Sequence, residues 1–200
     1  MRVLVYGAGA IGSLFGARLV ASGHAVTLVG RPEHVDAIRS SGLRIEGDRA
    51  GVVALPADTA IPAGPPPEAI LLTVKSFDLA GAAGTIGRRW SDPIPMLLPQ
   101  NGWGIERTVR EALGAAGRPV DSTLLLRFVH SIPATLLRPG VVRAAGTGTL
   151  TLPATDGAGS EPFAPLVTLL GSMGYPIERR PDFERALWEK LLVNAAINPV

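Results

Sequence analysis

The chain has 200 residues, which is enough for one complete domain and the beginning of a second. Apolar residues make up 46% of the chain and charged residues 18%, a composition that allows a buried core and excludes an intrinsically disordered protein. The 19 Lys and Arg residues nearly balance the 17 Asp and Glu residues and form no basic block, so we expect no nucleic-acid partner.

The first half of the chain alternates short β-branched runs with segments of helix length. The predicted strands are 3–6, 25–29, 52–55, 69–74 and 95–98, and the predicted helices are 11–21, 32–40 and 78–90. Such alternation is typical of a mostly parallel sheet with helices on both faces. The predicted fold class is therefore α/β of the Rossmann type.

Short β-rich runs dominate the second half, and we expect them to extend the first sheet. These runs are 122–131, 135–137, 141–144 and 147–152. A helix over 161–172, a strand over 175–179 and a new helix that starts near Asp182 follow. The breaker pair Pro181-Asp182 suggests a boundary. Residues 1–180 would then form an NADP-binding domain, and 181–200 the first helix of a truncated helical C-terminal domain.

The chain lacks cysteine, which excludes disulfides and thiolate metal sites and fits a reducing cytoplasm. Its histidines show no metal-ligand spacing, so we predict no metal, and we interpret His130 as a core or surface residue rather than a catalytic one. No run reaches the roughly 18 apolar residues that a membrane span requires. We therefore expect a cytoplasmic protein without a membrane partner.

A glycine-rich turn follows the first predicted strand and opens the first predicted helix. Gly7 would make the tight turn, Gly9 would let the backbone approach a pyrophosphate, and Gly12 would let the helix pack closely on the strand. An ordinary turn between strand and helix is the alternative. The predicted cofactor-binding residues of this turn are Gly7, Ala8, Gly9, Ala10, Ile11 and Gly12.

Arg31 follows the second predicted strand, where an NAD site usually offers Asp or Glu to the ribose hydroxyls. A guanidinium can hold a 2′-phosphate through paired, charge-assisted hydrogen bonds. This favours NADPH over NADH, although a solvated loop arginine is the alternative and Glu33 could soften the preference.

Two more polar groups follow predicted parallel strands. Lys75 comes after 69–74, and Asn101 comes after 95–98. Ligands of open parallel sheets gather at the carboxyl ends of strands, so both residues are candidates for contact with cofactor or substrate. A surface charge at Lys75 and a plain turn at Asn101-Gly102 are the alternatives.

Lys190, Asn194 and Asn198 lie four residues apart in the last predicted helix. This spacing keeps them within about 80° of one helix face, over about 12 Å of its length. Lysine can give a proton to a developing alkoxide, and asparagines can orient a carbonyl or carboxylate. A solvated stripe is the alternative, but asparagine is a poor helix former, so we favour a functional face.

Taken together, these motifs resemble the ketopantoate reductase (2-dehydropantoate 2-reductase) family over nearly the whole chain. The resemblance rests on residues 7–12, 73–76, 100–102 and 139–141, and on Trp188, Lys190, Asn194 and Asn198. It implies NADPH-dependent reduction of ketopantoate to pantoate in pantothenate synthesis. Lys190 would be the general acid, with Asn194, Asn198 and Asn101 on the substrate and Lys75 and Asn101 near the cofactor.

Two features of the sequence leave alternative functions or substrates open. The family has a longer helical second domain that supplies a carboxylate and a serine to the substrate, and only its first helix is present here. A non-catalytic dinucleotide-binding fragment or sensor is therefore an alternative. Residues 127–131 also differ from the small-residue segment expected near the active site, which leaves a different 2-keto acid possible. The family tends to dimerise, so a homodimer is also possible.

Overall fold

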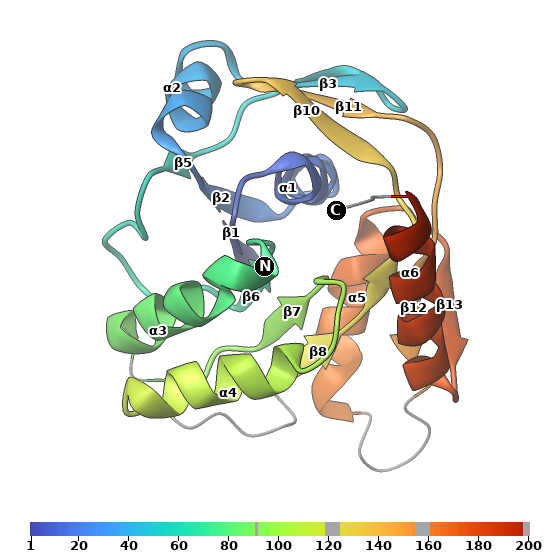
Figure 1. Ribbon diagram of the computed structural model, residues 1–200. Helices are drawn as coiled ribbons and strands as arrows, with labels where there is room; N and C mark the ends of the chain where they lie inside the picture. The colour runs from blue at the N-terminus through green and yellow to red at the C-terminus, as the bar shows by residue number, and fades with distance from the viewer. Residues whose placement is uncertain (91, 119–124, 155–160, 198–200) are drawn as a thin grey trace.

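The computed structural model describes residues 1–90, 92–118, 125–154 and 161–197 (Figure 1). At its centre is a six-stranded parallel sheet with the order β5-β2-β1-β6-β7-β8. The strands are β1 (Arg2–Tyr6), β2 (Ala25–Val29), β5 (Ala57–Asp58), β6 (Ala69–Leu72), β7 (Met96–Leu98) and β8 (Leu125–Arg127). The predicted α/β fold is confirmed. The strand order reverses between β1 and β6, where such sheets bind ligands.

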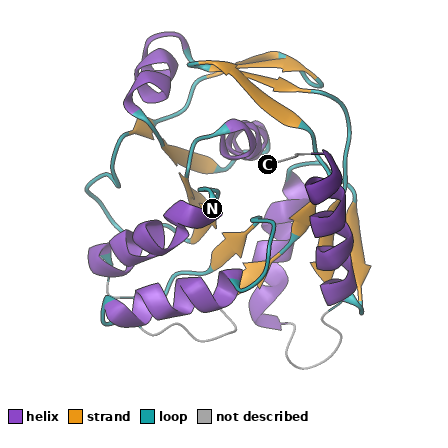
Figure 2. Ribbon diagram, in the orientation of Figure 1, coloured by secondary structure: helices purple, strands orange, loops and turns teal. Residues whose placement is uncertain are grey.

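The sheet is buried on both faces. Val3 and Val5 of β1 belong to one hydrophobic core, and Leu4 between them belongs to the other. Because side chains alternate along a strand, a strand covered on both faces is apolar at consecutive positions. Helix α1 (Ala10–Ala21) covers the first face, and α3 (Leu79–Arg89) and α4 (Ile105–Ala115) cover the second (Figure 2).

Helix α4 is an element that the sequence analysis did not predict. Its buried residues Ile105, Val109 and Leu113 lie four positions apart, the spacing of a single apolar stripe. This stripe packs beside α3 in the second core. The helical signal was therefore present in the sequence of this segment.

The β-rich runs do not all extend the first sheet, and that prediction was wrong. Among the strands that the structure describes in these runs, only β8 joins it. A second sheet has the order β10-β11-β3-β4, and a third has the order β13-β12-β9. An apolar run indicates a strand but does not identify its partner, which here can lie far away in the chain. The strands of the second sheet are β3 (Leu43–Gly47), β4 (Gly51–Val53), β10 (Ala134–Arg138) and β11 (Val141–Ala144).

The second sheet lies across α1 (Figure 1). Strand β11 pairs in parallel with β3, and β3 pairs antiparallel with β4, which replaces the strand predicted over 52–55. The predicted turn at Pro139-Gly140 joins β10 to β11, and Gly140 has a φ of 75°, a conformation that glycine adopts without strain. Helix α2 (Pro32–Ser41) connects β2 to β3.

The third sheet contains β9 (Val129–His130), β12 (Leu150–Pro153) and β13 (Ile177–Arg180). Helix α5 (Ala164–Ser172) adds its buried leucines to the first core, and α6 (Phe183–Ile197) packs against all three strands. Ala186 and Leu187 of α6 are buried, whereas Trp188, Leu192 and Val193 are exposed. Within the described ranges, no helix combines the length and the apolar character that a bilayer crossing needs.

Candidate active site

The glycine turn connects β1 to α1 at the carboxyl edge of the parallel sheet. The N–H groups of Gly7 and Ala8 both donate to the Val29 carbonyl, at 2.9 and 2.8 Å, which ties the turn to the end of β2. The Thr73 hydroxyl donates to the Gly7 carbonyl at 2.8 Å. A Cβ on Gly12 would overlap both the Gly7 carbonyl and the Thr73 hydroxyl, so only glycine fits there.

Gly9 differs from its two neighbours in the motif. It is exposed, and a Cβ on it would meet only the Gly7 carbonyl, at 4.0 Å, so the space above it is open. Gly9 is also the N-cap of α1, where the first N–H groups have no intrahelical partner. An open backbone surface beside free N–H groups suits a phosphate. The residues of the turn therefore fit a dinucleotide.

The buried His34 connects the start of α1, next to the glycine turn, to two other parts of the fold. The Gly140 N–H donates to His34 Nδ1 at 2.9 Å, so the other ring nitrogen, Nε2, carries the proton and donates to the Ser13 hydroxyl, also at 2.9 Å. Burial lowers the pKa of His34, which favours this neutral form. The first turn of α1 is thereby connected to α2 and to the β10–β11 turn.

Arg31 follows β2 and is the N-cap residue of α2. Its side chain is exposed. The preceding residue, Gly30, lies against the glycine turn, because a Cβ on it would come within 2.8 Å of the Ala8 Cβ. The backbone of Arg31 therefore lies at the edge of the candidate nucleotide site, and its role in holding a 2′-phosphate stays a prediction.

Lys75 lies three residues after β6, on the other side of the glycine turn. Gly7 touches this strand end, because a Cβ on Gly7 would come within 2.5 Å of the Val74 nitrogen. Lys75 is exposed and precedes a short 3-10 turn over Ser76–Asp78. The buried Gln100 side-chain amide donates to the carbonyls of Leu72 and Val74, which joins the end of β6 to the end of β7.

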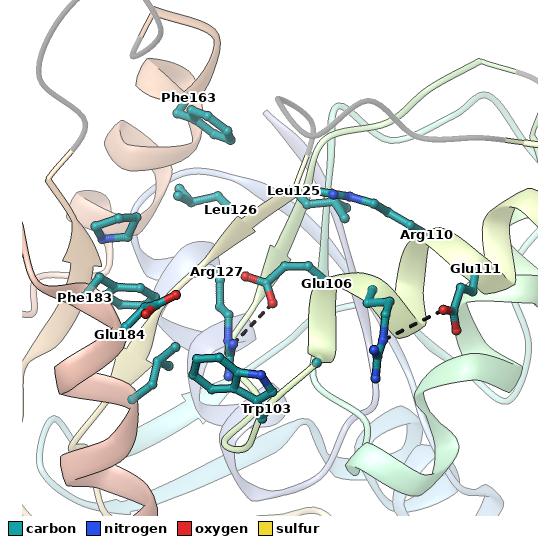
Figure 3. A pocket seen from close by; sticks show the side chains of 14 residues that line it. Trp103, Glu106, Arg110, Glu111, Leu125, Leu126, Arg127, Phe163, Phe183 and Glu184 are labelled. Atoms are coloured by element: carbon teal, nitrogen blue, oxygen red, sulfur yellow. Dashed lines mark hydrogen bonds and ion pairs between the residues drawn. The ribbon is translucent and has the colours of Figure 1, made fainter.

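Asn101 is the exposed first residue of a loop that leads from β7 toward α4. This loop, residues 101–104, is held by Arg127, whose side chain is only 6% exposed. Arg127 donates to the Gly102 carbonyl and pairs with Glu106 at 3.2 Å (Figure 3). Burial lowers the pKa of Arg127, and Glu106 opposes that shift. In the sequence, Arg127 stands out only as part of the segment 127–131, which differs from the small residues that the family resemblance implies.

The same loop meets α6. The rings of Trp103 and Trp188 have their centroids 5.6 Å apart and are tilted by 30°. Trp188 is two residues before Lys190, so this contact brings the helix that carries Lys190 beside the loop that carries Asn101. The backbone of Asn194 lies in α6, while its side chain and the whole of Asn198 are outside the described residues.

Lys190 is half-buried, and its charge reaches His130 of β9. Burial, together with the charge of Lys190, lowers the pKa of His130 to about 4. The His130 ring also packs edge-on against Phe15 of α1, with centroids 5.7 Å apart. His130 thus contacts α1 through Phe15 and also senses the charge of Lys190 on α6. The interpretation of His130 as a core or surface residue rather than a catalytic one stays a prediction.

A cavity of about 570 Å³ lies between α4 and α6, with Trp103 at its rim (Figure 3). Leu125, Phe163, Phe183 and Leu187 give it an apolar lining, and Glu106 and Arg127 also border it. Its lining does not include the glycine turn or Arg31. Among the described residues, no cluster of three or more His, Cys, Asp or Glu side chains is arranged to hold a metal ion.

Comparison with known families identifies the chain. The family model described as "Ketopantoate reductase PanE/ApbA" matches residues 3–157. The chain belongs to this family. The chain is also 35% identical to a 2-dehydropantoate 2-reductase of Halobacterium salinarum, over 99% of its own length and 64% of that protein.

Two solved structures show the same relationship in three dimensions. A PanE/ApbA family ketopantoate reductase from Ralstonia eutropha matches with a TM-score of 0.83 and 31% identity, over 99% of this chain and 62% of that one. A D-mandelate dehydrogenase solved with NADH and anilino(oxo)acetate matches with a TM-score of 0.84 and 26% identity, over the same shares of the two chains. This ketopantoate reductase family chain therefore spans less than two thirds of the length of each relative.

Proposed function

We propose that this protein is an NADP-dependent oxidoreductase that reduces a 2-keto acid, with 2-dehydropantoate (ketopantoate) as the favoured substrate and pantoate as the product. This reaction belongs to pantothenate and coenzyme A biosynthesis. The observation that carries the proposal is the open glycine turn at Gly9, in a chain of the ketopantoate reductase family. Residues 1–180 would bind the cofactor, and 181–200 would begin the second domain. We place the enzyme in the cytoplasm.

The proposed cofactor contacts follow the edge of the parallel sheet. The backbone of residues 7–12 would hold the pyrophosphate, and Arg31 would hold the 2′-phosphate of NADPH. Lys75 and Asn101, which follow the next two strands, would lie near the nicotinamide end. When bound, the reduced nicotinamide supplies a hydride. The exposed side chain of Arg31 and the contact of Gly30 with Ala8 support this orientation.

Lys190 would be the general acid. Negative charge develops on the oxygen of a 2-keto group as its carbon is reduced, and an ammonium group beside that oxygen both stabilises the charge and donates the proton. Asn194 and Asn198 would orient the substrate, together with Asn101. The contact between Trp103 and Trp188 supports this arrangement, because it joins the loop of Asn101 to α6.

A reductase for a different 2-keto acid is the second candidate. The structure solved for D-mandelate dehydrogenase favours it, because that relative of similar fold holds NADH and an aromatic oxo acid analogue. Residues 127–131, with the large side chains Arg127, Phe128 and His130, also differ from the small residues that the family resemblance implies. A homodimer could form through the exposed apolar residues Trp188, Leu192 and Val193.

The test is an assay of NADPH oxidation by the full-length protein with ketopantoate and, in parallel, with an aromatic 2-keto acid. Lys190→Ala should lower kcat by about 10² to 10⁴, the usual contribution of a general acid, and leave the Kd for NADPH within about twofold. Arg185→Ala is a matched control, because Arg185 is exposed on the same helix and, among the described residues, forms an ion pair only with Glu189. An unchanged kcat in Lys190→Ala would remove Lys190 from the mechanism.

A binding experiment distinguishes the two reductase candidates from a non-catalytic dinucleotide binder. If the full-length protein binds NADPH but reduces neither keto acid, the protein is a non-catalytic dinucleotide binder or sensor. If it prefers the aromatic acid, the second candidate is correct. Preferred turnover of ketopantoate supports the first.

A further inference from the structure

Arg127 is one of two buried arginines among the described residues, and it lies at the carboxyl edge of the sheet. The other, Arg18, pairs with Asp48 at 2.8 Å and connects α1 to the segment that follows β3. Arg127 is the last residue of β8 and pairs in register with Leu98 of β7. Its place beside the end of β7 puts a buried guanidinium directly under the loop of residues 101–104.

The end of the loop is held at Gly104, whose carbonyl accepts from the N–H and the hydroxyl of Thr108 at 3.0 and 3.1 Å, whereas its middle, at Gly102, is open. Gly102 and Gly104 have φ angles of 109° and 74°, and a Cβ on Gly102 would meet nothing within 4 Å. Asn101 and Trp103 on either side of Gly102 are exposed. A glycine-rich segment of this kind has many accessible conformations, so a contact that fixes its backbone has a large effect on where its side chains point.

Arg127 makes this contact. One of its nitrogens donates to the Gly102 carbonyl, and another lies 3.2 Å from a Glu106 oxygen in the first turn of α4 (Figure 3). Gly102 lies in the middle of the loop, and Glu106 lies in the first turn of α4, the helix that the loop enters. A planar guanidinium can hold two such acceptors at once in a defined geometry, which the single ammonium of a lysine cannot do as well.

The effect reaches α6 through Trp103. This residue follows Gly102 and packs against Trp188, although both residues are more than half exposed, at 57% and 52%. Because both residues are exposed, the relative orientation of their rings depends on how firmly their backbones are fixed. The chain of contacts therefore runs from Arg127 to Gly102, from Trp103 to Trp188, and so to the helix that carries Lys190.

We propose that Arg127 is a positioning residue that fixes the 101–104 loop and thereby sets the relation of Asn101 and Trp103 to helix α6. Arg127 touches neither the cofactor nor the substrate in this role; it acts through the backbone of Gly102 and through Glu106. Its effect on cofactor binding and turnover rests on the function proposed above, whereas its effect on the tryptophan pair does not.

The tryptophan pair provides the direct readout. Two stacked indoles produce a coupled circular-dichroism signal, and Trp103→Phe and Trp188→Phe define that signal by removing it. In the full-length protein, Arg127→Met should reduce the signal at least threefold without unfolding the chain, and Arg127→Lys should restore part of it. Arg107→Met is the matched control, because Arg107 lies on the same helix as Glu106 but its side chain is 79% exposed. This control should leave the signal unchanged.

Cofactor binding and turnover form the second arm. Arg127→Met should raise the Kd for NADPH and lower kcat by about fivefold or more, with Arg127→Lys between it and the parent. If Arg127→Met does not fold, Arg127→Lys and Glu106→Gln are compared with the parent instead. Glu106→Gln removes the charge that pairs with Arg127 but keeps the contact between Arg127 and Gly102.

A tryptophan signal that is unchanged in folded Arg127→Met or Arg127→Lys overturns the proposal, because a residue with a merely structural role would lower the unfolding midpoint only. If the parent protein neither binds NADPH nor turns over a keto acid, the proposed function fails, but the tryptophan arm still decides the role of Arg127.

Discussion

Protonation of His130 should destabilise the folded chain in mildly acidic solution. The ring packs edge-on against Phe15 and senses the charge of the half-buried Lys190, and its Nδ1 is buried with no hydrogen-bond partner among the described residues. Burial is the main cause that lowers its pKa, and the positive charge of Lys190 is the second. Both causes penalise the imidazolium form in the folded state only.

The magnitude follows from the two pKa values. The pKa of His130 falls from the ordinary 6.5 to about 4 in the folded state. Between these values the unfolded chain binds a proton that the folded chain does not, so the free energy of unfolding decreases as the pH falls from 6.5 to about 4. Each pKa unit corresponds to about 1.4 kcal/mol, so the full loss is about 3 kcal/mol. The loss is absent above pH 6.5.

The assay is urea unfolding at a series of pH values for the parent and for His130→Phe, which retains an aromatic ring beside Phe15. Carboxylates and the other two histidines also titrate in this range, but they are common to both proteins. The difference between the two unfolding free energies therefore isolates His130. It should change by about 2 kcal/mol between pH 7 and pH 5, in favour of the variant at low pH.

Lys190 provides a second, independent check. Lys190→Met removes the positive charge and should raise the pKa of His130, as measured by NMR titration of its ring protons. Lys75→Met is the matched control, because Lys75 is not among the groups that shift the pKa of His130. A pKa of His130 near 6.5 in the parent, or the same pH dependence of stability in parent and His130→Phe, would refute the reasoning.

Three further predictions concern the nucleotide site and the core. Arg31→Ala should weaken NADPH binding by about tenfold or more and leave NADH within about twofold, because only NADPH carries the 2′-phosphate; an equal effect on both, by titration, would exclude that contact. Gly12→Ala should lower the free energy of unfolding by about 1 to 3 kcal/mol and weaken NADPH binding, because its Cβ overlaps the Gly7 carbonyl; unchanged urea unfolding would contradict this. Asp48→Ala should cost about 2 kcal/mol in the same assay, because the side chain of its partner Arg18 is only 6% exposed; Glu46→Ala, from an exposed pair with Arg143, should cost less than 1 kcal/mol, and equal costs would contradict the argument.

Local sequence patterns predicted the Rossmann-type half well. The strands β1 and β2 and the helix α1 have clear periodicity and are bounded by clear breakers. Gly7 and Gly9 lie between β1 and α1, and Gly12 lies in the first turn of α1. Each glycine has its own physical requirement, and the three together mark a strand-to-helix turn even without coordinates. The predicted roles of Arg31, Lys75, Asn101 and Lys190 remain predictions.

The tertiary contacts of the candidate site were much harder to predict. Trp103 and Trp188 are 85 positions apart, and nothing local in either segment indicates that their rings stack. Arg127 lies in an apolar run, where a charged residue usually suggests an exposed strand edge. Its burial depends on Glu106 and Gly102, which the fold brings to it from the neighbouring loop.

The sequence by itself determined the elements that depend on neighbours in the chain: the apolar strands, the glycine turn, and the helix that carries Lys190 and Asn194. Only the tertiary structure decided how the later strands divide among three sheets and which buried charges pair. The reason is that periodicity and turn chemistry act over a few residues, whereas the partner of β11 is β3 and the partner of Arg127 is Glu106. Such pairings are chosen by the packing of the whole core.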